Sequence, residues 1–202
     1  MAEFCTVEDV STLLQIDIVE PVQVAAVLQA IKDASAAIQN YCRQIIVHVE
    51  DDEVELDGNG YQWMLLPELP VLSISEVIEN GVTLVENVDY KLGNFGLLYR
   101  LKGVWLKGPR TIRLTYTHGY VTIPDDIVSI CIRAAARTFQ AGLVSADNEG
   151  LLGIASKQLG DFSVSFVTPG SSSDGGSVGV SGSRLLLMSE KDILDRYKME
   201  EI

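Results

Sequence analysis

The run that most constrains the fold is residues 116–126, which leads directly into an almost wholly apolar segment, residues 127–139. This run closes a strand-rich middle. It then opens a helix through Pro124 and two aspartates, residues that favour the first helical turn. A second helical pattern, residues 22–43, lies just before the strand-rich middle. We therefore expect the two helices to pack together and the segment between them to project as an insert. This layout favours a component of an assembly over a catalyst.

The helical segments have recognisable ends and faces. Thr6 and Asp9 have the spacing of a capping box, which predicts a short helix from about residue 6. Residues 22–43 place apolar side chains at three- and four-residue spacing. Residues 124–142 form the predicted core helix, with apolar stripes on two sides. A helix of this kind is either central to a bundle or shared with another subunit. We expect its second stripe to pack between subunits: Val128, Ile132, Ala135 and Phe139.

Residues 45–118 change to the two-residue alternation of β-strands. Asp57-Gly-Asn-Gly60 is a strong turn signal and predicts a hairpin whose return strand is residues 63–66. Asn80-Gly81 predicts a second hairpin, with residues 82–85 pairing back. Residues 111–117 alternate apolar and polar side chains and form the last predicted strand. The insert is therefore expected to be β-rich and antiparallel.

Residues 150–202 form an extended C-terminal arm. It contains a Gly/Ser-rich segment, residues 168–183, typical of a flexible linker. Ser189 and Asp192 predict a capping box and a terminal helix over residues 189–199. Burying one leucine is worth roughly 1.5–3 kcal/mol, so the apolar tail is expected to dock on a partner. The residues expected at that interface are Phe162, Val164, Phe166, Leu185, Leu186, Leu187, Met188, Ile193, Leu194 and Tyr197.

Together these patterns predict an α+β fold in one domain, residues 1–202. It is a mainly helical bundle with helices in residues 6–43 and 124–142. A β-rich antiparallel insert separates the second and third helices, and the arm ends in a short helix. No run approaches the roughly 18 apolar residues of a membrane span. The first five residues lack the pattern of a secretory signal. We expect a soluble protein made in a cytoplasm, with its three cysteines buried as small apolar side chains.

Charge and motifs argue against several functions. The formal charge of −13 excludes bulk binding to nucleic-acid phosphates, which needs clustered Lys and Arg. His48 and His118 with three dispersed cysteines lack zinc-site spacing. The glycines of the arm match neither a phosphate-binding loop nor a dinucleotide fingerprint. We expect no catalytic residue, no cofactor and no metal.

Two alternatives stay open at this point. A hydrolase could use His118 with an aspartate such as Asp125. A carbohydrate- or protein-binding module could present an aromatic platform on the β insert, around Tyr61 and Trp63. Strand aromatics are more often core residues, so Tyr61, Trp63 and Tyr99 are expected to be buried.

The ordered set of motifs resembles the head–tail connector (adaptor) proteins of long-tailed bacteriophages. Residues 7–10 and the end of the alanine-rich helix, residues 38–43, are similar to the family's start. Its middle is matched by residues 65–71, 76–81 and 89–90. Thr117-His-Gly-Tyr120 and Ile123-Pro-Asp-Asp-Ile127 resemble its most recognisable segment. Residues 190–197 are similar to the closing helix of some members.

This resemblance implies a structural protein of the virion neck, made in the host bacterial cytoplasm. It implies a ring of copies, expected to be twelve-fold, beneath the portal protein. The ring would extend the DNA channel and bear a stopper or tail-terminator protein, with genomic DNA passing through without specific binding. The family offers no catalytic residue to transfer. Its portal contact corresponds to the segment after about residue 150.

Overall fold

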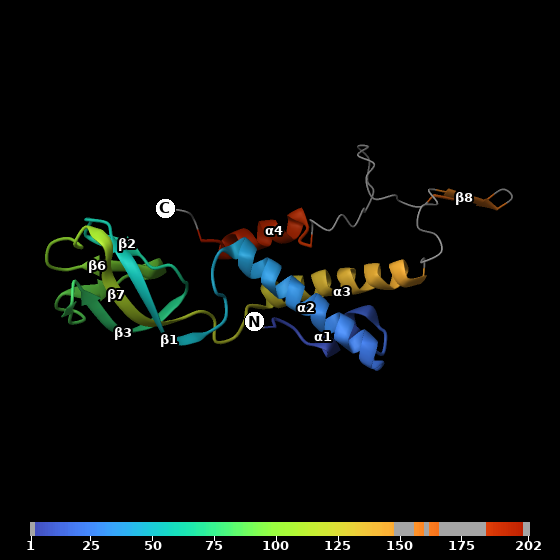
Figure 1. Ribbon diagram of the computed structural model, residues 1–202, viewed down its shortest axis with the longest axis horizontal. Helices are drawn as coiled ribbons and strands as arrows, with labels where there is room; N and C mark the ends of the chain where they lie inside the picture. Colours follow the sequence, from blue (N-terminus) through green and yellow to red (C-terminus); the bar gives the residue numbers. More distant parts are fainter. Residues whose placement is uncertain (1–2, 148–155, 160–161, 166–184, 200–202) are drawn as a thin grey trace. The chain divides into compact units, whose positions relative to one another are not determined.

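The computed structural model describes residues 3–147, 156–159, 162–165 and 185–199 (Figure 1). The chain divides into two compact units. The first comprises Glu3–Ile38 with Val128–Ile193, and the second comprises Gln39–Ile127 with Leu194–Ile202. The whole predicted insert, residues 45–118, thus falls in the second unit. The prediction of one domain over residues 1–202 stays a prediction.

The first unit is built mainly from helices α1 (Val7–Leu14), most of α2 (Pro21–Cys42) and most of α3 (Asp125–Asp147). The predicted capping box of α1 is confirmed: the Asp9 N–H donates to the Thr6 hydroxyl, and Asp9 Oδ2 accepts from the Thr6 N–H at 2.8 Å. Helix α3 does not end at Gly142 as predicted but continues to Asp147. An interior glycine costs a helix only about 1 kcal/mol, which a packed helix tolerates.

The first unit also contains a short hairpin and most of the last α-helix. Strands β8 (Ser156–Leu159) and β9 (Phe162–Ser165) pair antiparallel. Helix α4 (Met188–Leu194) is followed by the 3₁₀ turn η2 (Asp195–Tyr197), whose residues belong to the second unit. The predicted Gly/Ser-rich segment, residues 168–183, lies outside the described residues.

The second unit contains two antiparallel sheets. The larger has the order β1 (Val49–Gly58), β7 (Gly108–His118), β3 (Val71–Glu79), β4 (Val82–Thr83). The smaller has the order β2 (Trp63–Leu65), β6 (Leu97–Arg100), β5 (Tyr90–Leu92), with the 3₁₀ turn η1 (Asn94–Gly96) before β6. Every ladder between these strands is antiparallel. The predicted antiparallel β insert is confirmed.

One predicted hairpin is present and the other is not. Glu79 pairs with Val82 across Asn80 and Gly81, whose φ angles of 47° and 82° suit a tight hairpin turn. The hairpin predicted at residues 57–60 is wrong, because β1 pairs with β7 in one sheet and β2 with β6 in the other. A turn signal does not decide which strand becomes the partner.

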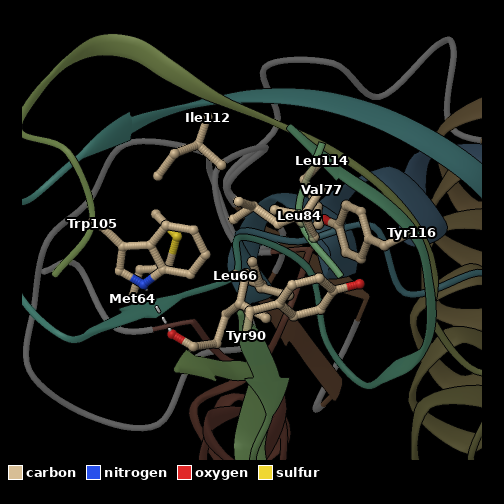
Figure 2. Packing of buried hydrophobic residues seen from close by; sticks show 10 residues of the cluster. Met64, Leu66, Val77, Leu84, Tyr90, Trp105, Ile112, Leu114 and Tyr116 are labelled. Atoms are coloured by element: carbon tan, nitrogen blue, oxygen red, sulfur yellow. Dashed lines mark hydrogen bonds between the residues drawn. The ribbon is translucent and has the colours of Figure 1, made fainter. Parts of the chain in front are cut away.

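The core of the second unit lies between the two sheets. Val77, Ile112, Leu114 and Tyr116 come from the larger sheet, and Met64, Tyr90 and Leu98 from the smaller. Trp105 is fully buried, and its indole Nε1–H donates to the Leu98 carbonyl at 3.3 Å. Figure 2 shows these side chains gathered in one cluster, with that hydrogen bond drawn as a dashed line. The β unit therefore has a hydrophobic core of its own.

This core corrects part of the predicted fold class. The α+β class is confirmed, but the mainly helical bundle is wrong, since strands account for 29% of the structure against 40% for helices. The helical periodicity is strong in sequence because amphipathic helices repeat over many turns. The strands are short, so each contributes a weaker signal.

Candidate assembly surfaces

The C-terminal arm is attached to α3 through a buried ion pair in the first unit. Arg137 Nη1 lies 2.8 Å from Glu190 Oε1, and its Nη2 lies 2.7 Å from Oε2. Arg137 Nη2 also donates to the Leu185 carbonyl at 3.0 Å. Arg133 adds a longer contact, 3.8 Å to Glu190 Oε1. Glu190 is only 3% exposed, so its charge depends on these arginines.

The same carboxylate fixes the start of α4. Glu190 Oε2 accepts from the Leu187 N–H at 2.9 Å, an interaction of the kind that a third-position glutamate makes with the residue before a helix. The helix begins at Met188 and not after Ser189, so the predicted capping box at residues 189–192 is wrong. Glu190 instead accepts from the backbone N–H of Leu187, and its ion pair with Arg137 holds the carboxylate in that position.

In the second unit, the residues after α4 attach to the end of α2. Tyr41 donates its hydroxyl to Asp195 Oδ1 at 2.6 Å, and the Met199 N–H donates to the Cys42 carbonyl at 3.0 Å. Gln44 Nε2 donates to the Tyr197 carbonyl at 2.6 Å. Gln44 Oε1 accepts from the Leu69 N–H at 3.1 Å, so this buried amide connects η2 to the loop before β3.

Tyr197 makes a second set of contacts in this unit. Its ring meets the Tyr120 ring edge-on, with centroids 6.0 Å apart and an interplanar angle of 75°. Its hydroxyl lies 3.5 Å from Asp126 Oδ2. Partial burial, followed by the nearby Asp126 charge, raises the pKa of Tyr197. The terminal residues are thus packed and hydrogen-bonded at a defined place.

A groove of about 430 Å³ lies beside these residues in the second unit. Phe95 is one of its lining residues, 85% exposed and with a φ of 58°. The lining mixes apolar and polar side chains: Gln44, Leu69, Pro70, Val71, Gly93, Asn94, Phe95, Gly96, Tyr120, Arg196, Tyr197, Lys198 and Met199. This open, mixed surface is of the kind that contacts another protein.

The structure distributes the predicted interface residues unevenly. Leu186 and Leu194 are buried within the chain, whereas Leu187 is exposed and Met188 is 70% exposed. Leu185, Ile193 and Tyr197 are half-buried. Phe162 and Val164 lie on β9, and Phe166 lies outside the described residues. Of the described side chains in the arm, Leu187 and Met188 therefore present the most apolar surface.

The stripe of α3 predicted to pack between subunits is partly covered by its own chain. Ala135 and Phe139 are buried, and Val128 and Ile132 are half-buried. Only Val128 and Ile132 keep apolar surface for a neighbouring copy. Subunit packing by these two residues stays a prediction.

Three exposed aromatic side chains lie on the smaller sheet and just before its strand β2, and we call them the aromatic strip: Tyr61, Trp63 and Tyr99. Tyr61 is 63% and Trp63 44% exposed, and their rings stack with centroids 6.3 Å apart. Tyr99 is the cross-strand partner of Trp63. The expectation that these residues are buried is wrong. Met64 and Leu98 alternate with them and fill the core, which leaves the strip on the outer face.

The histidine of the hydrolase alternative is a core residue. His118 is fully buried in β7, and its Nε2 lies 3.2 Å from Asp52 Oδ2. Its ring packs on that of Tyr116, with centroids 4.8 Å apart. Within the described residues, no three His, Cys, Asp or Glu side chains are placed to hold a metal ion. No described helix is long and apolar enough to span a bilayer.

The fold is shared with a solved virion structure. A chain from the virion of a native gene transfer agent particle is 14% identical, with a TM-score of 0.54, and the likeness covers 96% of this chain and 89% of that chain. A chain from the neck of the empty particle, computed with C6 symmetry, is 13% identical, with a TM-score of 0.48 and coverage of 88% and 80%. For the neck of the native particle, computed with C12 symmetry, the identity is 11%, the TM-score 0.44 and the coverage 96% and 91%. No curated protein matches the sequence.

The fold is therefore one that is also found in the virion of a gene transfer agent particle. The head completion protein family matches residues 3–133, and the chain belongs to that family. This membership confirms the resemblance to head–tail connector proteins and the expected place in the virion. The matched residues include every quoted motif except the closing helix.

Proposed function

We propose that the protein forms a ring of identical copies, twelve-fold, beneath the portal protein at the capsid vertex. The ring extends the DNA channel and provides the platform for a stopper or tail-terminator protein. The observation that carries this proposal is the match of the head completion protein family to residues 3–133. The role is structural and not enzymatic, and the protein is made in the host bacterial cytoplasm before it joins the virion.

The C-terminal arm is the proposed contact with the portal protein. Leu187 and Met188 are exposed, yet the Glu190 carboxylate fixes the Leu187 backbone beside them. A partner that covers these side chains meets a backbone that is already ordered, so less conformational entropy is lost on binding. The family match ends at residue 133, so the arm is where this chain is adapted to its own partner.

The test is a double substitution, Leu187→Asp with Met188→Asp, in the full chain within the infected host. We expect DNA-filled heads to lose their DNA or remain tailless, because two charges oppose burial in the portal contact. Electron microscopy of the particles and the infectious titre are the measurements. Val121→Asp is the control, since Val121 is 75% exposed and lies in the second unit. Normal particles from the double variant would remove the arm from the portal contact.

Packing between copies is assigned to Val128 and Ile132 on α3. Both retain apolar surface on a helix whose neighbouring apolar residues, such as Ile127 and Cys131, are buried. A charge at Ile132 would prevent a neighbouring helix from packing there. Native mass spectrometry of the protein mixed with portal protein tests this: Ile132→Asp should abolish the ring and leave the monomer folded. A complete ring from that variant would place the subunit contact elsewhere.

Genomic DNA is proposed to pass through the ring without specific binding. Each copy contributes a formal charge of −13, and β1 exposes Glu50, Asp51, Glu53 and Glu55. A lumen lined with these acids repels phosphates. Glu50→Lys with Asp51→Lys should slow DNA ejection from assembled particles. An unchanged ejection rate would show that these acids do not face the channel.

A second candidate function has one observation in its favour. The aromatic strip is exposed and stacked, as a carbohydrate- or protein-binding module on the β insert would require. Titration of the purified protein with oligosaccharides, followed by Trp63 fluorescence, tests this candidate. Saturable quenching that Tyr61→Ala removes, from a protein that stays monomeric with portal protein, would favour it over the connector.

A further inference from the structure

Two cysteines that are 126 positions apart meet inside the first unit. Cys5 Sγ lies 3.4 Å from Cys131 Sγ, and both side chains are buried. Cys5 belongs to the segment before α1, and Cys131 lies on α3. The expectation of buried cysteines is confirmed for both. The two sulfur atoms, however, face each other directly, which the packing of small apolar side chains alone does not require.

Ser35 of α2 completes a small polar cluster around the two thiols. Its hydroxyl lies 3.5 Å from Cys131 Sγ and accepts from the Phe4 N–H at 3.2 Å. The Ser35 oxygen accepts from the Phe4 N–H, and its hydroxyl hydrogen is available to donate to Cys131 Sγ. Hydrogen bonds from Cys5 and Ser35 lower the pKa of Cys131, against the effect of burial. The same pairing raises the pKa of Cys5. Cys131 is therefore the sulfur better prepared to react as a thiolate.

We propose that Cys5 and Cys131 form an oxidisable pair that a small-molecule disulfide, such as oxidised glutathione, closes to an intramolecular disulfide. The bond needs a sulfur–sulfur distance of about 2.05 Å, so the two side chains together must approach by about 1.4 Å. Such a shift is small enough for side-chain rotation and a slight movement of the segment before α1. Local opening of that segment, which Phe4 holds to Ser35, admits the oxidant.

The reaction balances through two exchange steps. Cys131 as thiolate attacks one sulfur of the oxidised glutathione and releases one glutathione thiolate, which takes up the proton from Cys131. Cys5 then loses its proton and attacks the Cys131 sulfur of the mixed disulfide, which releases the second glutathione. The protein loses two electrons and two protons, and the oxidant becomes two molecules of the thiol.

The proposed pair has a use in a virion protein. Cytoplasmic thiols are kept reduced, whereas disulfides persist outside the cell. The pair would stay open during assembly and close after the particle is released. The closed bond joins the segment before α1 to α3 and restricts the unfolded chain. It would thus make the first unit harder to unfold when the particle is outside its host.

The experiment compares the full-length protein in reducing buffer with the same protein incubated in oxidised glutathione. After alkylation of free thiols under denaturing conditions, intact mass spectrometry should show the oxidised protein with one alkyl group, on Cys42, and the reduced protein with three; the closed bond itself removes about 2 Da. Tryptic digestion should link the peptide of residues 1–32 to that of residues 114–133. Cys42 lies in a separate peptide, residues 33–43, which should stay unlinked.

Stability supplies a second measurement. Oxidation of the wild-type protein should raise the midpoint of thermal unfolding by about 5–10 °C. Cys42→Ser should show the same rise, and Cys5→Ser should show none. A link that involves Cys42, links between molecules, or glutathione adducts alone would overturn the proposal. So would the absence of any oxidised form of the wild-type protein.

Discussion

Gly119 lies so close to Val47 that a β-carbon at position 119 would be 2.1 Å from the Val47 carbonyl oxygen. Its φ of 85° is also one that residues with a side chain rarely adopt. Gly119 follows β7, and Val47 forms an isolated bridge with Tyr120. The glycine therefore allows two backbones to meet at the end of the larger sheet.

Gly119→Ala should destabilise the second unit by at least about 3 kcal/mol, because the backbone of residues 47 and 48 must move. Gly103→Ala is the matched control: its φ is 86°, but no atom lies within 4 Å of the added carbon. The control should lose only about 1 kcal/mol, from the left-handed backbone alone. Urea unfolding followed by the fluorescence of buried Trp105 measures both. Equal losses of stability in the two variants would show that the backbone near Val47 can move away from the added carbon at no cost.

Arg137→Ala should destabilise the first unit by about 2 kcal/mol, because Glu190 is left buried without its bidentate partner. The loss stays moderate because the Arg137 side chain is 33% exposed and Arg133 can move closer. Arg133→Ala, which removes only the 3.8 Å contact, should change the free energy of unfolding by less than about 1 kcal/mol. Denaturant unfolding compares the variants. A larger loss of stability from Arg133→Ala than from Arg137→Ala would show that Arg133 is the main partner of Glu190.

Gln44→Ala should cost about 2 kcal/mol and loosen the end of the arm, because the Tyr197 carbonyl and the Leu69 N–H both lose their partner. Hydrogen exchange at the Leu69 amide should accelerate. Gln62→Ala, at an exposed glutamine of the same unit, is the control and should be nearly neutral. An unchanged exchange rate at Leu69 would mean that another acceptor replaces Gln44.

Glu68→Gln should alter the pH dependence of stability. Burial, the largest cause, raises the pKa of Glu68 above its ordinary value, although the Ile45 N–H and His118 oppose it. The folded state thus favours the protonated carboxyl. Its stabilising contribution is complete below the ordinary value of about 4.3 and is lost as the pH rises through the raised pKa. As the pH rises through the raised pKa, the Glu68→Gln variant should therefore become more stable relative to the wild-type protein.

The measurement is the free energy of unfolding of both proteins from about pH 4 to about pH 8. Glu76→Gln, at an exposed position of β3, corrects for the removal of one negative charge. Parallel profiles for wild type and Glu68→Gln would contradict the expected effect of burial on Glu68.

Local features of the fold could be predicted from the sequence because their causes are local. The Thr6–Asp9 capping box and the Asn80–Gly81 turn each depend on a few adjacent residues, and both are present. Strand partners depend on contacts far along the chain. The signal at residues 57–60 therefore lies at the end of β1 but predicts the wrong pairing, since Gly58 pairs with Gly108.

The candidate surfaces were less predictable for the same reason. The residues around Glu190 are ordinary for an exposed helix, and nothing near it in sequence indicates the Arg137 contact. Gln44 likewise gives no signal of its two partners. The exposure of Trp63 was missed because its aromatic character alone favours burial, whereas strand alternation places its neighbour Met64 inside. That alternation was available in the sequence and would have found the aromatic strip.

Strand β7 determines when the larger sheet can form during translation. It lies between β1 and β3, and β1 has no other ladder among the described strands. Those two strands are synthesised before it, so the edges that face β7 wait unpaired until residue 118 has left the exit tunnel. Chaperones that shield nascent chains would be needed most in that interval. A run of slow codons translated just after residue 118 has emerged would give the sheet time to close.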